Sequence, residues 1–158
     1  YKVDKEPYLT FAARQHGAAW EKPFVSVYEP FTSAEGKSIA NISSFEDQNG
    51  NTEFVGLNIT HKSGREDVVF SSANHKMSTD ATYTLIANEK NGDWVIFIGN
   101  GKEAAVKGFN ISANEFGNVV LKEKDGELWL HNEVAVTITQ DNKEQQFKAG
   151  DLRVISIN

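Results

Sequence analysis

The sequence has no cysteine, only three prolines and one methionine in 158 residues. Without cysteine, disulfide scaffolds, zinc–thiolate sites and cysteine nucleophiles are excluded. No apolar run approaches the roughly 18 residues that a transmembrane helix needs, so no membrane span is predicted. Helix-forming composition is confined to residues 33–37 and 103–106, and segments this short do not form stable helices alone. Little or no helix is therefore expected.

Positive charge is also scarce, with 16 Lys and Arg against 22 Asp and Glu and a net charge of −6. Nucleic-acid binding needs a basic surface that neutralises phosphates, so no nucleic-acid partner is predicted. The four histidines, His16, His61, His75 and His131, do not have the spacing of a zinc site. A chain of this length can bury a core without metal or disulfides.

The sequence is rich in the alternation of apolar and polar residues that is typical of β-strands. Strict alternation predicts that one side of two strands points to the core: Val55, Leu57 and Ile59, then Val134, Val136 and Ile138. Residues 24–28 and 94–98 are apolar on both faces, as in central strands that are covered on both sides. Turn dipeptides recur between the runs, namely Asn49-Gly50, Ser63-Gly64, Asn91-Gly92, Asn100-Gly101 and Asp125-Gly126. The prediction is an all-β fold: one antiparallel two-sheet β-sandwich over residues 1–158, with about ten to fourteen strands.

The most distinctive stretch is LTFAARQHGAAWEKPFVSVYEPF, residues 9–31. An arginine is followed by a loop and then by FVSVYEPF, residues 24–31. Downstream, Asp80 and Leu85 frame a strand, and the motif NGDW at 91–94 opens a hydrophobic run. This layout resembles the C-terminal β-region of the heparinase II/III-like polysaccharide lyases.

The resemblance implies a larger parent enzyme. Such lyases join an N-terminal (α/α) toroid to a β-sandwich and cleave acidic, uronate-containing polysaccharides, glycosaminoglycans among them, by β-elimination. Their catalytic residues come mostly from upstream segments, and none of those motifs is matched here. The chain is therefore expected to be a C-terminal accessory domain, inactive alone, with the upstream toroid and an acidic polysaccharide as partners. The resemblance also implies a periplasmic or secreted bacterial protein.

Five residues are candidates for substrate contact. Arg14 and His16 flank a turn before Trp20, where an arginine can pair with a uronate or sulfate in bidentate fashion and an indole can stack on a sugar. The alternative is that Arg14 pairs with Glu29 and His16 is solvated. Tyr28 and Glu29 have acid–base chemistry, although neighbours on a strand point to opposite faces. No catalytic residue is assigned.

A calcium loop is a second hypothesis. Oxygen-bearing side chains alternate at Asp47, Asn49, Asn51 and Glu53, as they do in calcium-binding loops. The spacing departs from an EF-hand because glycine stands at the fourth position, and an Asn-Gly hairpin explains the stretch equally well. No other cofactor is predicted.

Two alternative functions remain open: a stand-alone carbohydrate-binding module with exposed aromatic residues, and a ligand-free structural β-sandwich of an exported protein. Trp94 is expected in the core, whereas Trp129 alternates with Leu128 and Leu130 and is expected to face away from them. If the chain is part of a larger enzyme, it should expose an apolar patch, to which residues 24–31 and their neighbour, residues 1–14, contribute.

Overall fold

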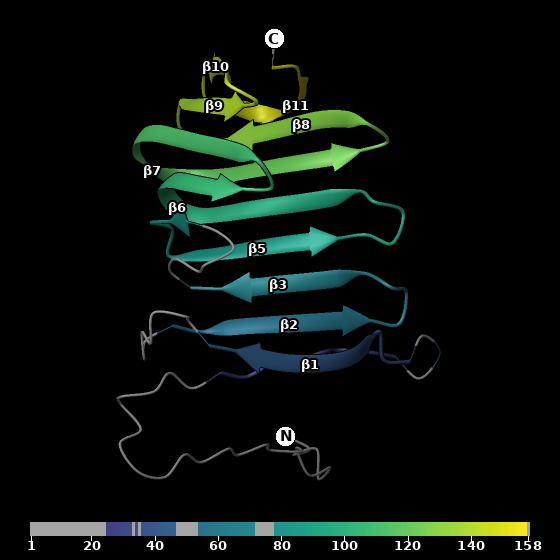
Figure 1. The fold of residues 1–158 in the computed structure, drawn as a ribbon. Coiled ribbons are helices and arrows are strands. Elements are labelled where there is room, and N and C mark those ends of the chain that lie inside the picture. The colour runs from purple at the N-terminus through teal and green to yellow at the C-terminus, as the bar shows by residue number, and fades with distance from the viewer. Residues whose placement is uncertain (1–24, 33, 35, 47–53, 72–77, 158) are drawn as a thin grey trace, which may run out of the picture.

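The computed structural model describes residues 25–32, 34, 36–46, 54–71 and 78–157. Within these ranges it contains strands and no helix, and every strand pair is antiparallel (Figure 1). The strands are β1 (Ile39–Phe45), β2 (Gly56–His61), β3 (Glu66–Phe70), β4 (Ser78–Thr79), β5 (Tyr83–Asn88), β6 (Trp94–Val106), β7 (Phe109–Lys124), β8 (Glu127–Asn132), β9 (Val136–Gln140), β10 (Lys143–Phe147) and β11 (Gly150–Ile155). The all-β, antiparallel prediction is confirmed.

The main layer is a row of neighbouring strands in the order β1-β2-β3-β5-β6-β7-β8-β11. Glycines with positive φ stand in its predicted turns: Gly64, Gly92 and Gly126. Asp125 also has a positive φ of 53°, so Asp125-Gly126 forms the tight β7–β8 hairpin that such a dipeptide favours. Two further tight turns, Lys107-Gly108 and Asp141-Asn142, were not expected from the sequence.

One part each of β6 and β7 belongs to a smaller second layer. Beyond a register break at Gly101, the distal half of β6 pairs with β4, and the first part of β7 pairs with β9, which in turn pairs with β10. Gly101 lies opposite Gly117 at this bend. A Cβ at Gly117 would stand 2.7 Å from a methyl carbon of Val134, and one at Gly101 would stand 2.8 Å from Ala81 Cβ. Both positions therefore require glycine because other chain segments pass so close.

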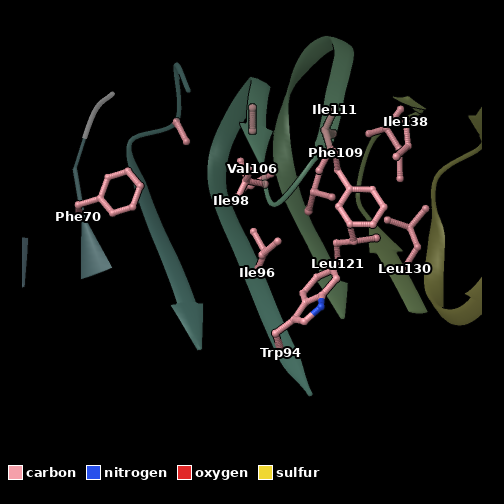
Figure 2. Close-up of a cluster of buried hydrophobic side chains, with 14 of the residues drawn as sticks. Phe70, Trp94, Ile96, Ile98, Val106, Phe109, Ile111, Leu121, Leu130 and Ile138 are labelled. Atoms are coloured by element: carbon pink, nitrogen blue, oxygen red, sulfur yellow. The ribbon is translucent and has the colours of Figure 1, made fainter. Parts of the chain in front are cut away.

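The second layer folds over one face of the main layer. Trp94 opens β6 and Phe109 opens β7, on opposite ends of a long hairpin, yet their ring centroids are only 5.6 Å apart. Figure 2 shows the cluster that fills the space between, with side chains from β6, β7, β8 and β9 converging. Its fully buried members are Ile96, Ile98, Leu121, Leu130 and Ile138. The two layers belong to one continuous hydrogen-bonded sheet that is joined through β6 and β7.

Several local expectations need correction. Asn100-Gly101 lies inside β6 rather than in a hairpin. Residues 103–106, which have helix-forming composition, also belong to β6, in line with the expectation of little or no helix. Residues 25–30 are irregular rather than a strand. Val136 and Ile138 are buried and Val134 packs against the core as predicted. Val55, Leu57 and Ile59 are instead partly exposed and lie outside the core cluster, and Leu57 and Ile59 are on the other face of the sheet. No helix suited to crossing a membrane occurs in the part of the chain that the structure describes.

Candidate functional site

The face of the main layer that points away from the second layer is apolar; we call it the open face. One row of side chains runs directly from strand to strand over β2, β3, β5, β6 and β7: Leu57, Val69, Leu85, Phe97 and Val120. All five are partly exposed, and none belongs to the core cluster or packs against it. At about 4.8 Å between strands, four spacings make this row ~19 Å long.

A second, parallel row extends the open face to both edges of the sheet. Its apolar members are Ile42, Ile59, Ala87, Val95, Trp129 and Val154, of which Ala87 is buried. Ile42 is 41% exposed and Val154 is 51% exposed. Tyr83, 46% exposed, lies beside the first row with its ring 5.4 Å from that of Phe97. Single exposed apolar residues are normal, but contiguous rows over a whole sheet mark a contact surface.

Charged residues interrupt the second row at two points. Lys122 lies between Val95 and Trp129, and its Nζ is 5.9 Å from the Trp129 ring centroid. Asp67 lies between Ile59 and Ala87 and is buried, with 8% exposure. These groups give the open face fixed polar positions within an apolar surface.

The Asp67 carboxylate is paired with two neighbouring side chains, Arg65 and His61. Arg65 donates from Nε to Oδ1 at 2.7 Å and from the guanidinium to Oδ2 at 3.1 Å, and His61 Nε2 lies 3.0 Å from the same Oδ2. Glu89 stands on the far side of Arg65, at 3.6 Å. The hydrogen bond to Asp67 raises the pKa of Arg65 above its ordinary value. A carboxylate held by these two partners joins β2 to β3 and is already engaged in three contacts within the domain.

The sequence had not singled out Arg65 or Asp67. The stretch HKSGRED spans a turn, and its alternating charges are typical of any solvated hairpin. Only the register Ile59 opposite Asp67 brings the carboxylate beside His61. Among the described residues no group of three or more His, Asp or Glu could hold a metal ion. Neither Tyr28 nor Tyr83 hydrogen-bonds to the Asp67 cluster.

Of the predicted substrate contacts, Tyr28 and Glu29 lie in the described chain. The Glu29 carboxylate accepts hydrogen bonds from Ser38 N, from Ser38 Oγ at 2.7 Å and from Ile39 N at 2.9 Å. The Ser38 hydroxyl and the Ile39 amide hold the pKa of Glu29 below its ordinary value. Tyr28 is 76% exposed. Glu29 therefore anchors the irregular segment to β1 through Oε1, while Tyr28 is free to contact another molecule.

The other candidates fall outside the described residues: Arg14, His16 and Trp20, and the four calcium candidates Asp47, Asn49, Asn51 and Glu53. Their substrate and calcium roles stay predictions. The tryptophans follow the alternation argument, since Trp94 is 7% exposed in the core and Trp129 is partly exposed on the open face.

Comparison with known proteins indicates the class of protein to which this chain is related. No family model matches the chain, and no solved structure matches it. Among curated proteins the chain matches a polysaccharide lyase, with 32% identity over 89 residues. That relative is an endo-acting ulvan lyase of Formosa agariphila; the match covers 56% of this chain and 9% of the lyase. The chain thus spans less than a tenth of the relative's length, and over this stretch it is distantly related to a polysaccharide lyase.

Proposed function

We propose that this chain is the accessory C-terminal β-domain of an exported, heparinase II/III-like polysaccharide lyase. In this proposal the parent cleaves an acidic, uronate-containing polysaccharide by β-elimination, and its catalytic residues lie upstream of Tyr1. The open face is the surface through which the domain packs on the catalytic part of the same polypeptide. The extent of that apolar face is the observation that carries the proposal.

The match to the ulvan lyase supports the parent's class. The relative is far longer than this chain, so most of a protein of that kind would lie outside these 158 residues. Of the carboxylates described above, Asp67 is already paired with Arg65 and His61, and Glu29 is hydrogen-bonded to Ser38 and Ile39. β-Elimination needs a base at the C5 proton and a group that stabilises the developing carboxylate charge. Both requirements fall to the proposed upstream part.

The open face favours a docked domain over a free-standing module. Burying a Leu, Val or Phe side chain stabilises by roughly 1.5–3 kcal/mol relative to full exposure. A face with two rows of such apolar residues and two built-in charged positions resembles the interior contact of a larger protein more than a solvated surface. A stand-alone module would leave this stabilisation unused and would expose the face to self-association.

A charge placed on the open face tests the docking. In the isolated chain Leu85→Glu should lower the melting temperature only slightly, because Leu85 is already partly exposed. In the full-length parent the same change should release the domain to limited proteolysis and lower lyase activity, since a carboxylate would be buried against an apolar partner. The matched control is Asn41→Glu, which adds the same charge at an exposed position on the opposite face of the main layer.

Each outcome of this experiment has a distinct meaning. Equal resistance of Leu85→Glu and Asn41→Glu parents to protease would overturn docking through the open face. A stable dimer of the isolated chain that Leu85→Glu dissociates, together with an unaffected parent, would assign the face to a second copy instead. Release of unsaturated uronate, followed by its near-ultraviolet absorbance, from any acidic polysaccharide by the isolated chain would refute the accessory role.

A further inference from the structure

The outward surface of the second layer carries a groove of different character. It has a volume of 620 Å³ and is lined by side chains from β6, β7, β9 and β10. A second hollow of 210 Å³ adjoins it and shares Glu103 and Ser112 as lining residues. Together the two depressions form one elongated path across the strands, which we call the outer groove. An elongated path suits a segment of an extended polymer better than a compact small molecule.

The polar residues of the outer groove are ordered by strand register. Glu103 pairs with Ser112, Ser112 with Thr137, and Thr137 with Gln146, so four polar side chains follow one another across β6, β7, β9 and β10. Neighbouring strands are about 4.8 Å apart. This repeat is close to the length of one sugar ring along an extended polysaccharide.

These side chains are free to bind a ligand. Glu103, Ser112, Thr137 and Gln146 make no side-chain hydrogen bond to any other part of the described chain, and neither does Asn114 at the groove's edge. Near the bend between the two layers polar side chains are engaged: Asp80 accepts from Lys102 N at 2.7 Å and Glu103 N at 2.9 Å, and Asn118 accepts from Asn100 N at 2.9 Å. The outer groove thus collects unused hydroxyl, amide and carboxylate groups on a stiff support.

The support is stiff because the opposite faces of the same strands lie in the core. Ile111, Val136 and Ile138 alternate with the groove residues on β7 and β9 and are 4%, 3% and 0% exposed. Side chains on strands that are fixed in this way lose little further backbone freedom when they bind. Ala135 and Phe147 complete the lining, although the Phe147 side chain packs against the core, and Lys148 supplies a cation at the end opposite Glu103.

We infer that the outer groove binds a segment of an acidic polysaccharide. Ring hydroxyls bind the row from Ser112 to Gln146, Glu103 accepts hydrogen bonds from sugar hydroxyls at one end, and Lys148 pairs with a carboxylate or sulfate at the other. The choice of an acidic polysaccharide rests on the proposed function, whereas the position of the site rests on the groove itself. The domain would then hold substrate as well as pack on the parent enzyme.

The test uses the 158-residue chain and soluble ulvan, titrated by calorimetry at low salt, with uncharged dextran as a second probe. Thr137→Val and Gln146→Ala should each weaken ulvan binding about five-fold, the effect of losing roughly one net hydrogen bond. The matched control is Thr139→Val, which changes the same residue type on the same face of β9 outside the groove. It should leave the dissociation constant unchanged.

Lys148→Gln tests the acidic contact separately. It should weaken ulvan binding, flatten its salt dependence and leave dextran binding as it was, whereas Lys143→Gln on the exposed start of β10 should do none of these. Melting curves of all variants confirm that each is folded. Ulvan binding that is absent in the unsubstituted chain, or equal in Thr137→Val and Thr139→Val, would overturn the inference. Leu85→Glu should bind ulvan normally, so failure of the docking proposal and failure of this one are distinguishable.

Discussion

The two faces of the main layer are both apolar, but one is buried and the other is partly exposed. On β6, Trp94, Ile96 and Ile98 are covered by the second layer, while Val95 and Phe97 between them remain partly exposed. Both sets are strongly apolar, so hydrophobicity alone does not decide which side becomes the core. The covered face is buried by the chain's own long hairpin, and the open face has no described element over it. An uncovered apolar face is therefore as informative as a core, because it indicates a contact with another part of the protein or another molecule.

The sharpest way to test this comparison is a matched pair of leucines. Leu121→Ala removes a side chain with 0% exposure from the centre of the core and should lower the free energy of unfolding by about 2–5 kcal/mol, through lost burial and a cavity. Leu85→Ala on the open face should cost less than half as much, because its side chain is already partly hydrated. Urea unfolding of both variants measures the difference. Equal losses would mean that the open face is covered in the isolated chain.

Removing the Asp67 carboxylate from the open face should give the next largest loss of stability. Asp67→Ala leaves Arg65 and His61 without their acceptor at a buried position and should cost roughly 1–3 kcal/mol. Glu66→Ala, one residue away on the same strand but exposed, should change stability by less than about 0.5 kcal/mol. Chemical denaturation of the two variants is the measurement. Similar values would show that the Asp67 cluster adds nothing to the hairpin.

One substitution on the covered face, Thr84→Val, is expected to stabilise the domain. Thr84 is fully buried between Phe70 and Ile98, and its hydroxyl has no hydrogen-bond partner among the described residues. Thr84→Val replaces that hydroxyl with a methyl group of similar shape and should raise the free energy of unfolding by about 1 kcal/mol. A rise in the urea midpoint with an unchanged slope confirms it. A fall would mean that the hydroxyl is satisfied in solution.

The smallest expected effect is a pH dependence of stability that comes from two carboxylates, Glu29 and Glu133. Hydrogen bonds to the carboxylates hold the pKa of Glu29, beside Ser38, and of Glu133, beside Asn118, below the ordinary 4.5. A lowered folded-state pKa means that the stabilisation is present above pH 4.5 and is lost as pH falls through the lower folded value. Carboxyl chemical shifts followed by NMR should give midpoints below 4.5 for both groups. Glu133→Gln should remove its share of the acid-dependent loss of stability.

The elements were largely predictable, because a strand's identity depends on local alternation and on turn chemistry. Asp125-Gly126 predicts a tight hairpin, since both residues tolerate positive φ, and the hairpin forms. Asn100-Gly101 carries the same signal but lies at the bend of β6, where the second layer departs from the first. A positive φ serves a bulge as well as a turn. Local sequence therefore identifies the conformation and not the topological role.

The candidate surfaces were less predictable. The pattern of residues 55–59 correctly separates two faces, yet it assigns Leu57 and Ile59 to the core, and they lie on the open face. The outer groove was not foreseen at all, because Glu103, Ser112, Thr137 and Gln146 are far apart in the chain and ordinary in type. Only the pairing of β6, β7, β9 and β10 brings them into one row.

Sequence patterns were enough to identify an antiparallel β-domain without thiol chemistry and without a match to catalytic motifs, with a local likeness to polysaccharide lyases. These properties depend on composition and on residues that are neighbours in the chain. Tertiary structure alone decided which apolar face is buried and which polar residues meet. A period-two pattern is symmetric between the two faces of a strand, and that symmetry is broken only when the β6–β7 hairpin bends at Gly101 and Gly117 and covers one of them.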